Sequence, residues 1–420
     1  MNGAAKRPRL LFVSPRFLFP MDQGGKIRTG NILRGLKGGA FDVTLASPAP
    51  ADVRRFVSDL DGACDHFISW PDHTRTRLDR VASLMSKLPV AVASDRSAAG
   101  SARILAALGS KPAVVVVDFP HAGVLVPHTI DAVSIMFTHN VEAEIFARHA
   151  SRARGMWRLI WSAQSRKMIR FEGDTLRRFD SVIAVSQRDA EVLTRQYGLA
   201  QVDAIDTGVD LDFFTAAPAS AAADPGPDGG TLVFVATMTW QANVEGIHFL
   251  LDEVWPTLTA ARPNINAVII GRNPPASLSD KIRERRLNVT LTGFVDDIRP
   301  YVANAHVYVI PLFVGSGTRI KAFEAMAMGR PVVSTSLGIE GLDVTDGEHF
   351  LRADDAREFS RAVLALLDNQ AQRARIAGAA RQLMEQRFSW KTVASQFEAI
   401  CYRALERRDA KISAAATTLA

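Results

Sequence analysis

Residues 315–324 read Gly-Ser-Gly-Thr-Arg-Ile-Lys-Ala-Phe-Glu and bring glycines, two cations and a carboxylate into one short stretch. They follow the apolar run 307–310 and open a predicted helix. A glycine-rich loop before a helix presents free backbone N–H groups and the positive end of the helix dipole, which favours a phosphate group. Arg319 and Lys321 add positive charge, and Glu324 could accept two hydrogen bonds from a ribose diol. The stretch predicts a nucleoside-diphosphate site, with a plain surface loop and helix as the alternative.

The first half of the chain holds a second set of residues that could do chemistry. Gly24 and Gly25 stand at the head of a predicted helix, where a ligand can approach the bare backbone, although such a pair also makes ordinary tight turns. His139 follows an apolar run and could face a ligand cleft; a satisfied core or surface histidine is the alternative. His121 follows another apolar run and is the weaker candidate. Glu142 could orient His139 or the acceptor, and it could equally cap the next helix.

Both halves of the chain repeat an order of short apolar strand, turn and amphipathic helix that would position these residues. Predicted strands lie at 9–13, 41–46, 113–117, 133–137 and 181–185, and then at 231–235, 267–270, 289–291, 307–310 and 331–334. Continuous Val, Ile and Leu runs suit parallel strands covered by helices on both faces. Ligands of such sheets bind beyond the carboxyl ends of the strands. We therefore predict two doubly wound, Rossmann-like α/β domains with a cleft between them.

The boundaries of these domains follow from composition. The first domain is expected at 1–212 and the second at 231–387, joined by a Pro-, Gly- and Ala-rich linker at 213–230. A helix at 388–408 is expected to cross back to the first domain, and the tail 409–420 is expected to fray.

Composition narrows the class of protein. The 420 residues are 47% hydrophobic and 22% charged, which is ordinary for a globular protein. Cys64 and Cys401 lie too far apart in sequence to form a metal-ligand motif or a disulfide framework. The sequence shows no apolar run near the ~20 residues of a membrane-spanning helix, so we expect a cytoplasmic protein. The net charge of +6 mildly favours anionic partners without choosing among them.

The run 324–333, Glu-Ala-Met-Ala-Met-Gly-Arg-Pro-Val-Val, carries a resemblance to a known family. It is similar to the retaining GT-B glycosyltransferases of family 4, whose hallmark is a glycine-bearing loop followed by Glu-Ala-Met-Ala-x-Gly-x-Pro-Val-Val. The resemblance implies a GT-B fold and transfer of a sugar from a nucleotide sugar, with retention. Because the second domain has no Asp-x-Asp metal motif placed after a strand, we expect no essential metal. Other nucleotide-sugar chemistry on this fold, or a binding protein that has lost catalysis, are the alternatives.

The resemblance also implies roles for single residues. Glu324 would hold the nucleotide ribose, and His139 would lie next to the reacting end of the sugar. The remaining expected donor contacts are the Gly24-Gly25 loop over the diphosphate and the loop amides at Ser316, Gly317 and Thr318.

Two departures from the family pattern bear on the donor site. Ser316 occupies the place of a second glutamate that usually contacts the donor sugar. The stretch after 231–235 lacks the usual Arg and Lys, so our hypothesis gives Arg319 and Lys321 the task of neutralising the diphosphate. Trp240 and Asn243 lie in this stretch, which resembles a bacterial subgroup associated with exopolysaccharide assembly. Trp240 could line the nucleotide site or only pack against the domain.

One segment suggests where the acceptor resides. Residues 145–171 contain seven Arg or Lys and no acidic residue, together with Trp157 and Trp161. Basic charge with aromatic residues is typical of a helix lying on an anionic membrane surface. The acceptor would then be a glycan linked to a lipid; a solvated helix with inward-facing tryptophans is the alternative.

Overall fold

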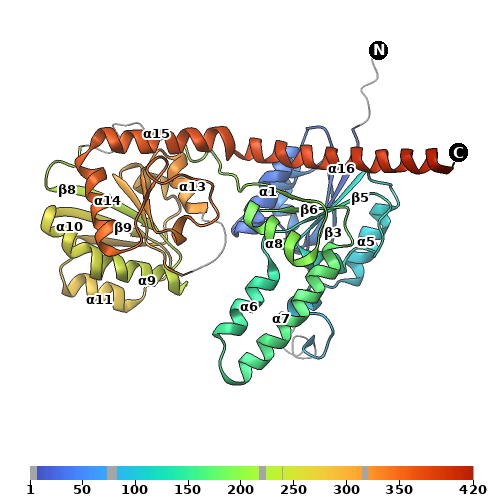
Figure 1. The fold of residues 1–420 in the computed structure, drawn as a ribbon, viewed down its shortest axis with the longest axis horizontal. Coiled ribbons are helices and arrows are strands. Elements are labelled where there is room, and N and C mark those ends of the chain that lie inside the picture. Colours follow the sequence, from blue (N-terminus) through green and yellow to red (C-terminus); the bar gives the residue numbers. More distant parts are fainter. Residues whose placement is uncertain (1–6, 73–82, 217–223, 239, 315–319, 420) are drawn as a thin grey trace, which may run out of the picture. The chain divides into compact units, whose positions relative to one another are not determined.

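The computed structural model describes residues 7–72, 83–216, 224–238, 240–314 and 320–419. It consists of two compact units (Figure 1). Unit 1 comprises Met1–Thr207 with Trp390–Ala420, and unit 2 comprises Gly208–Ser389. Each unit is a parallel sheet with helices on its faces, so the predicted pair of doubly wound α/β domains is confirmed.

The sheet of unit 1 has the strand order β3-β2-β1-β4-β5-β6-β7. Its strands are β1 (Arg9–Val13), β2 (Asp42–Ala49), β3 (His66–Pro71), β4 (Val114–Asp118), β5 (Val133–Phe137), β6 (Ser181–Ala184) and β7 (Val202–Ala204). All neighbours are parallel; Phe12 of β1 lies opposite Leu45 of β2 and Val116 of β4. Because the chain moves outward in both directions from β1 and β4, the switch point where ligands usually bind lies between these two strands.

The helices of unit 1 are α1 (Gly24–Leu36), α2 (Val57–Ala63), α4 (Val90–Ser94), α5 (Ala98–Leu108), α6 (Glu142–Arg152), α7 (Gly155–Leu176), α8 (Gln187–Tyr197) and α16 (Trp390–Leu419). Helix α8 shows why these segments begin and end where they do. The Ser186 hydroxyl accepts a hydrogen bond from the Asp189 amide at its start, and Gly198 ends it in the left-handed conformation at φ 63°.

Helix α16 contributes to the core of unit 1, although it follows unit 2 in sequence. Its buried Phe397 contacts Phe12 and Phe137 of the sheet. A side chain at Gly35 of α1 would collide with Ala394, so glycine allows the close approach of α1 and α16. The helix extends to Leu419, through the tail that was expected to fray. The reason is local: no glycine or proline interrupts an alanine-rich sequence with high helix propensity.

The sheet of unit 2 has the strand order β10-β9-β8-β11-β12-β13. Its strands are β8 (Gly229–Val235), β9 (Asn264–Ile270), β10 (Val289–Gly293), β11 (Val307–Ile310), β12 (Val332–Ser334) and β13 (Leu351–Arg352). Its helices are α9 (Gln241–Phe249), α10 (Trp255–Ala261), α11 (Ala276–Glu284), α12 (Arg299–Ala303), α13 (Ile320–Ala327), α14 (Ala356–Asp368) and α15 (Gln370–Arg387). Here the switch point lies between β8 and β11.

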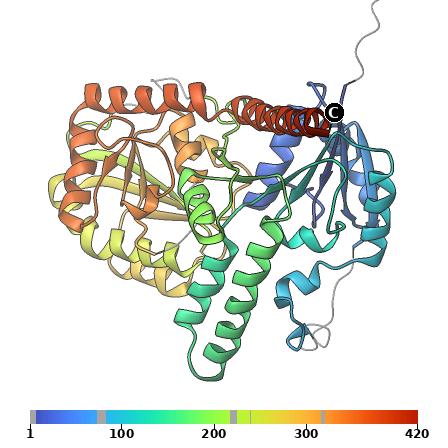
Figure 2. The same ribbon diagram turned by 45° about the vertical axis from the view of Figure 1, so that its right-hand side comes forward.

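The basic segment 145–171 is a hairpin of two helices, and the single surface helix expected from sequence is wrong. Figure 1 and Figure 2 both show α6 and α7 projecting as an antiparallel pair from unit 1. The chain turns at Gly155, whose φ of 55° is readily accessible only to glycine. Trp161 packs inward against Phe146 and His149, with ring centroids 5.8 and 4.5 Å away. Trp157 lies near the turn and is 66% exposed.

Candidate functional site

Asp118 is the centre of a buried polar cluster at the switch point of unit 1. It is the last residue of β4 and has no exposed surface. Its carboxylate accepts hydrogen bonds from the hydroxyls of Ser14, 3.1 Å away, and Thr29, 3.1 Å away. Ser14 directly follows β1 and Thr29 lies on α1, so one carboxylate joins both strands of the switch point to the first helix.

His139 joins this cluster from the loop after β5. Its Nε2 lies 2.6 Å from Asp118 Oδ1 and its Nδ1 lies 3.1 Å from a terminal nitrogen of Arg28. Because a carboxylate only accepts and a guanidinium only donates, Nε2 must carry the proton and Nδ1 must accept. Burial lowers the pKa of His139, and the charge of Asp118 opposes that shift.

His139 was expected to face a cleft, but only 4% of it is exposed. Both ring nitrogens have partners within the protein, so the neutral ring is held in one tautomer and one orientation. Contact with a sugar would use the ring edge, or would require one nitrogen to exchange its partner for the ligand.

Arg28 and the Gly24-Gly25 pair bring α1 into the same cluster. The Arg28 guanidinium also donates to the Thr207 hydroxyl, 2.6 Å away. Burial lowers the pKa of Arg28 to about 10, against the opposing charge of Asp118. A Cβ at Gly25 would lie 2.8 Å from the ring of Phe119 and 3.8 Å from His139 Nδ1. The absence of a side chain at residue 25 therefore allows the start of α1, whose first residue is Gly24, to lie close to His139.

Phe119 forms a wall of this cluster in a strained conformation. Its ring stacks on His139 with centroids 4.0 Å apart and planes at 16°. Its φ is 67°, a left-handed value that costs a residue with a side chain about 1–3 kcal/mol. Such strain is concentrated at functional sites, where surrounding contacts hold the residue in place.

His121 forms a separate buried group with two carboxylates. Its Nδ1 lies 3.5 Å from Asp95 and its Nε2 lies 3.6 Å from Glu142. Although burial acts to lower its pKa, hydrogen bonding to Asp95 and the charges of both carboxylates raise it above the ordinary value. The side chain of Glu142 thus accompanies His121, and the expectation that it orients His139 is wrong.

The cap of α6 is supplied by Glu172, and the expected capping role of Glu142 is also wrong. The Glu172 carboxylate accepts from the backbone N–H groups of Glu142 and Ala143, at 2.8 and 3.1 Å. The Tyr197 hydroxyl donates to it over 2.6 Å. Burial raises the pKa of Glu172 to about 7.

Unit 2 contains a cavity of about 230 Å³ at its own switch point. Its wall includes Val235 at the end of β8 and Ile310 at the end of β11. The other described residues that line it are Phe234, Thr237, Trp240, Asn243, Tyr308, Leu312, Ile320, Lys321 and Ala322. The cavity thus lies beyond the carboxyl ends of parallel strands, where sheets of this type bind nucleotides.

Three polar side chains give this cavity its chemistry. Lys321 donates to the carbonyl of Val235, 3.0 Å away, which leaves two of its three N–H groups for other acceptors. Asn243 donates to the carbonyl of Thr237, 2.8 Å away, with its amide oxygen remaining as an acceptor. The hydroxyl of Tyr308 is buried and has no hydrogen-bond partner among the described residues. Trp240 forms an exposed part of the wall.

Glu324 lies one turn after Lys321 on α13 and is partly buried. Burial raises the pKa of Glu324 above its ordinary value, and the nearby positive charge of Lys321 only partly opposes this shift. Glu324 is not among the described residues that line the cavity. Ser316, Gly317, Thr318 and Arg319, which were expected to contact the diphosphate, lie outside the described residues.

Sequence reasoning missed Asp118, Arg28, Phe119 and Tyr308. The signal for Asp118 was available, because it ends a fully apolar strand run at the predicted switch point. Arg28 could have been found from its position one turn after Gly24 and Gly25. Phe119 carries no sequence signal for its backbone conformation. Among the described residues, no group of three or more His, Cys, Asp or Glu side chains is arranged to hold a metal ion.

Comparison with protein families matches both units. A model described as Glycosyltransferase Family 4 matches residues 23–213, and one described as Glycosyl transferases group 1 matches residues 229–369. The chain belongs to glycosyltransferase family 4. As a member of this family, it has the GT-B fold of two Rossmann-like units, as the resemblance at 324–333 implied.

Individual relatives of this family 4 chain are distant. A phosphatidyl-myo-inositol mannosyltransferase of Mycobacterium leprae is 30% identical over 46% of this chain and 51% of its own length. A glycogen synthase of Mycobacterium tuberculosis is 28% identical over 64% of this chain and 65% of its own length. The chain thus spans about half to two thirds of these curated relatives.

A solved structure extends the likeness over nearly the whole chain. The structure of Anabaena Alr3699/HepE in complex with UDP superposes with a TM-score of 0.65 at 14% identity, covering 94% of this chain and 100% of the other. At this identity, the likeness concerns the fold alone.

Proposed function

We propose that this chain transfers a glycosyl unit from a nucleoside-diphosphate sugar to a hydroxyl group, with retention at the anomeric carbon. The bond between the anomeric carbon and the diphosphate oxygen breaks, and its electron pair leaves with the diphosphate. The acceptor oxygen forms the new bond on the same face of the sugar, and its proton passes to the departing diphosphate. The observation that carries the proposal is the cavity at the switch point of unit 2, within the segment matched by the group 1 model.

The side chains around this cavity suit a nucleoside diphosphate. Lys321 offers positive charge where negative charge builds up on the leaving diphosphate, the interaction that accelerates such a step. Trp240 offers an aromatic face to a base. Glu324 is proposed to accept from the ribose hydroxyls, while the amides at 316–318 and Arg319 are proposed contacts of the diphosphate. Gly24, Gly25 and His139 remain proposed contacts of the donor.

Donor turnover tests this proposal directly. Release of free nucleotide should be measured for UDP-, GDP- and ADP-sugars, with and without a mixture of glycan acceptors. We expect one nucleotide to be released, and UDP is our first candidate because the Anabaena structure holds UDP. A nucleotide that raises the melting temperature without any turnover would favour a binding protein that has lost catalysis. No binding and no turnover with any of the three would contradict the proposal.

We propose further that the acceptor is a glycan or a lipid-linked glycan of bacterial polysaccharide assembly, reached at an anionic membrane surface. None of the described helices combines the length and the hydropathy of a membrane-spanning segment. The turn of the α6–α7 hairpin instead exposes Met156, Trp157 and Leu159, each by 66% or more. Exposed apolar side chains beside Arg154 and Arg158 suit the boundary between lipid headgroups and acyl chains.

Changing Met156, Trp157 and Leu159 together to serine should reduce binding to anionic vesicles at least about tenfold, because each apolar side chain contributes about 1.5–3 kcal/mol when fully buried. The measurement is co-sedimentation with vesicles of phosphatidylglycerol and phosphatidylcholine. Leu105→Ser is the matched control, because Leu105 is 61% exposed on α5, away from the hairpin. Equal losses in both variants, or wild-type binding that ignores lipid charge, would count against a docking hairpin.

A further inference from the structure

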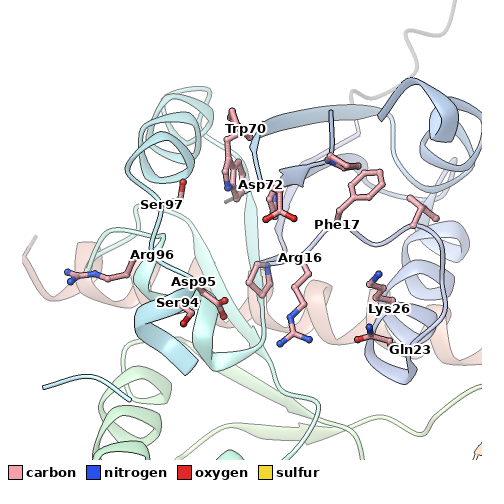
Figure 3. Close-up of a pocket in the computed structure, with 15 residues that line it drawn as sticks. Arg16, Phe17, Gln23, Lys26, Trp70, Asp72, Ser94, Asp95, Arg96 and Ser97 are labelled. Atoms are coloured by element: carbon pink, nitrogen blue, oxygen red, sulfur yellow. The ribbon is translucent and has the colours of Figure 1, made fainter. Parts of the chain in front are cut away.

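A second cavity, of about 430 Å³, lies in unit 1 at the carboxyl ends of β1, β2 and β3. Its size is within the usual range of small-molecule sites. Figure 3 shows that polar side chains reach it from several separate segments. These are the loop after β1, the start of α1, the end of β3 and the segment between α4 and α5. We call this cavity the loop pocket.

One side of the loop pocket is basic. Arg16 extends its guanidinium between the side of Ser94 and Asp95 and the side of Gln23 and Lys26 (Figure 3). Arg16 is exposed, and no carboxylate among the described residues forms an ion pair with it. Lys26 is half-buried beside it and pairs with Asp22 at 3.1 Å. Arginine presents a planar set of N–H donors that matches a carboxylate or phosphate.

The other side of the loop pocket presents hydrogen-bond acceptors next to a third cation, Arg96 (Figure 3). Asp72 follows β3 and Asp95 follows α4, and both carboxylates line the cavity. Asp95 is held from behind by His121, at 3.5 Å. Ionised carboxylates only accept hydrogen bonds, so this side suits the hydroxyl groups of a sugar ring. Phe17 adds an apolar surface to the loop pocket.

The loop pocket also adjoins the buried His139 cluster within unit 1. The Arg16 guanidinium lies 5.9 Å from the centre of the Phe119 ring, which stacks on His139. Lys26 lies on the first turn of α1 beside Gly25, which faces the same ring. A molecule in the pocket would therefore lie near the residues proposed to contact the donor.

We propose that the loop pocket binds the acceptor and that this acceptor is an acidic saccharide, a sugar carrying a carboxylate or a phosphate. Arg16 and Lys26 bind the anionic group, and Asp72 and Asp95 accept from ring hydroxyls. The inference rests on the proposed transfer and adds the class of acceptor that the reaction uses.

The test is a titration of the full chain with matched small sugars, with UDP present in excess to occupy the donor cavity. Methyl glucuronide and methyl glucoside differ in one carboxylate, and glucose 6-phosphate supplies a phosphate. We expect the two acidic sugars to bind about tenfold or more tightly than methyl glucoside, because hydrogen bonds to charged groups are stronger than neutral ones. The tighter of the two acids identifies the source of the anion, uronic acid or phosphate.

Variants connect this preference to the pocket. Arg16→Gln should remove the advantage of the acidic sugars, and Asp95→Asn should weaken all three sugars alike. Arg54→Gln, at an exposed arginine elsewhere in unit 1, is the control and should keep the preference. Equal affinity for methyl glucuronide and methyl glucoside would overturn the inference. Inorganic phosphate that binds as tightly as glucose 6-phosphate would also overturn the inference, because the sugar ring would then contribute nothing to the affinity.

The titration and the donor assay can fail separately. If the chain turns over a nucleotide sugar but shows no preference for acidic sugars, the proposed transfer stands and the inference about the acceptor is wrong. If the chain binds acidic sugars through Arg16 but turns over no donor, the loop pocket is an acidic-sugar site and the proposed transfer is wrong.

Discussion

Replacing Asp118 with alanine is expected to reduce the local stability of unit 1 by about 3–5 kcal/mol, the usual cost of removing one partner from a buried charged network. The variant would remove the nearby charge of Asp118 that offsets the burial of the Arg28 cation. It would also remove the carboxylate acceptor of His139 Nε2, which would keep only the Thr29 hydroxyl at 3.4 Å. Ser14 and Thr29 would also lose the acceptor of their hydroxyls. Hydrogen exchange of the β1 and β4 amides, measured by mass spectrometry, reports this loss within unit 1.

Asp131→Ala provides the matched control for this prediction. Asp131 pairs with Arg408 at 2.8 Å, but its side chain is 95% exposed. Exposed ion pairs contribute about 0–1 kcal/mol, so exchange in β1 and β4 should stay near the wild-type rate. Asp118→Asn should fall between the two, since an amide keeps an acceptor and loses the charge. If Asp118→Ala and Asp131→Ala exchange at the same rate, the cluster does not stabilise the switch point.

Replacing Glu324 with alanine is expected to lower kcat/KM for the nucleotide sugar by about 10²- to 10⁴-fold. Two hydrogen bonds from ribose hydroxyls to a carboxylate contribute about 1.5–3 kcal/mol each, and each 1.36 kcal/mol corresponds to a factor of ten. The measurement is steady-state nucleotide release with the donor identified by the screen.

Nucleotide analogues make the ribose contact itself visible. The wild-type chain should bind the natural nucleoside diphosphate far more tightly than its 2′,3′-dideoxy form, and Glu324→Ala should bind both equally. Glu284→Ala is the control, because Glu284 is an exposed helical glutamate in unit 2. Should Glu324→Ala still discriminate between the two nucleotides, the ribose is held by another group.

Much of the fold could be predicted from apolar runs. The run 113–117 and its counterparts at 231–235 and 307–310 are continuous and largely hydrophobic, which is typical of central parallel strands. The short or irregular edge strands β3, β7 and β13 were missed, because a strand with one neighbour needs less apolar surface and resembles a loop in sequence. His66–Pro71, for example, is mostly only half-buried.

The candidate site was predicted in part, and the reason for the limit is physical. Motifs such as residues 315–324 can be identified from the sequence because their residues are neighbours in it. The partners of His139 do not, because Asp118 and Arg28 reach it from a different strand and a helix, and only tertiary packing brings them within 3.1 Å. Similarly, sequence placed Trp157 and Trp161 on one basic segment. Because the chain turns at Gly155, Trp161 faces the partner helix and Trp157 faces solvent.

The place of α16 in the core of unit 1 has a consequence for biosynthesis. Unit 2 is one uninterrupted segment, Gly208–Ser389, and all of it is synthesised before α16. Every residue of unit 2 is therefore joined to the chain before Phe397, which completes the apolar core of unit 1 around Phe12 and Phe137. The half of the protein synthesised first is thus the half completed last, and during that interval its unfinished core is the part of the nascent chain most in need of chaperone protection.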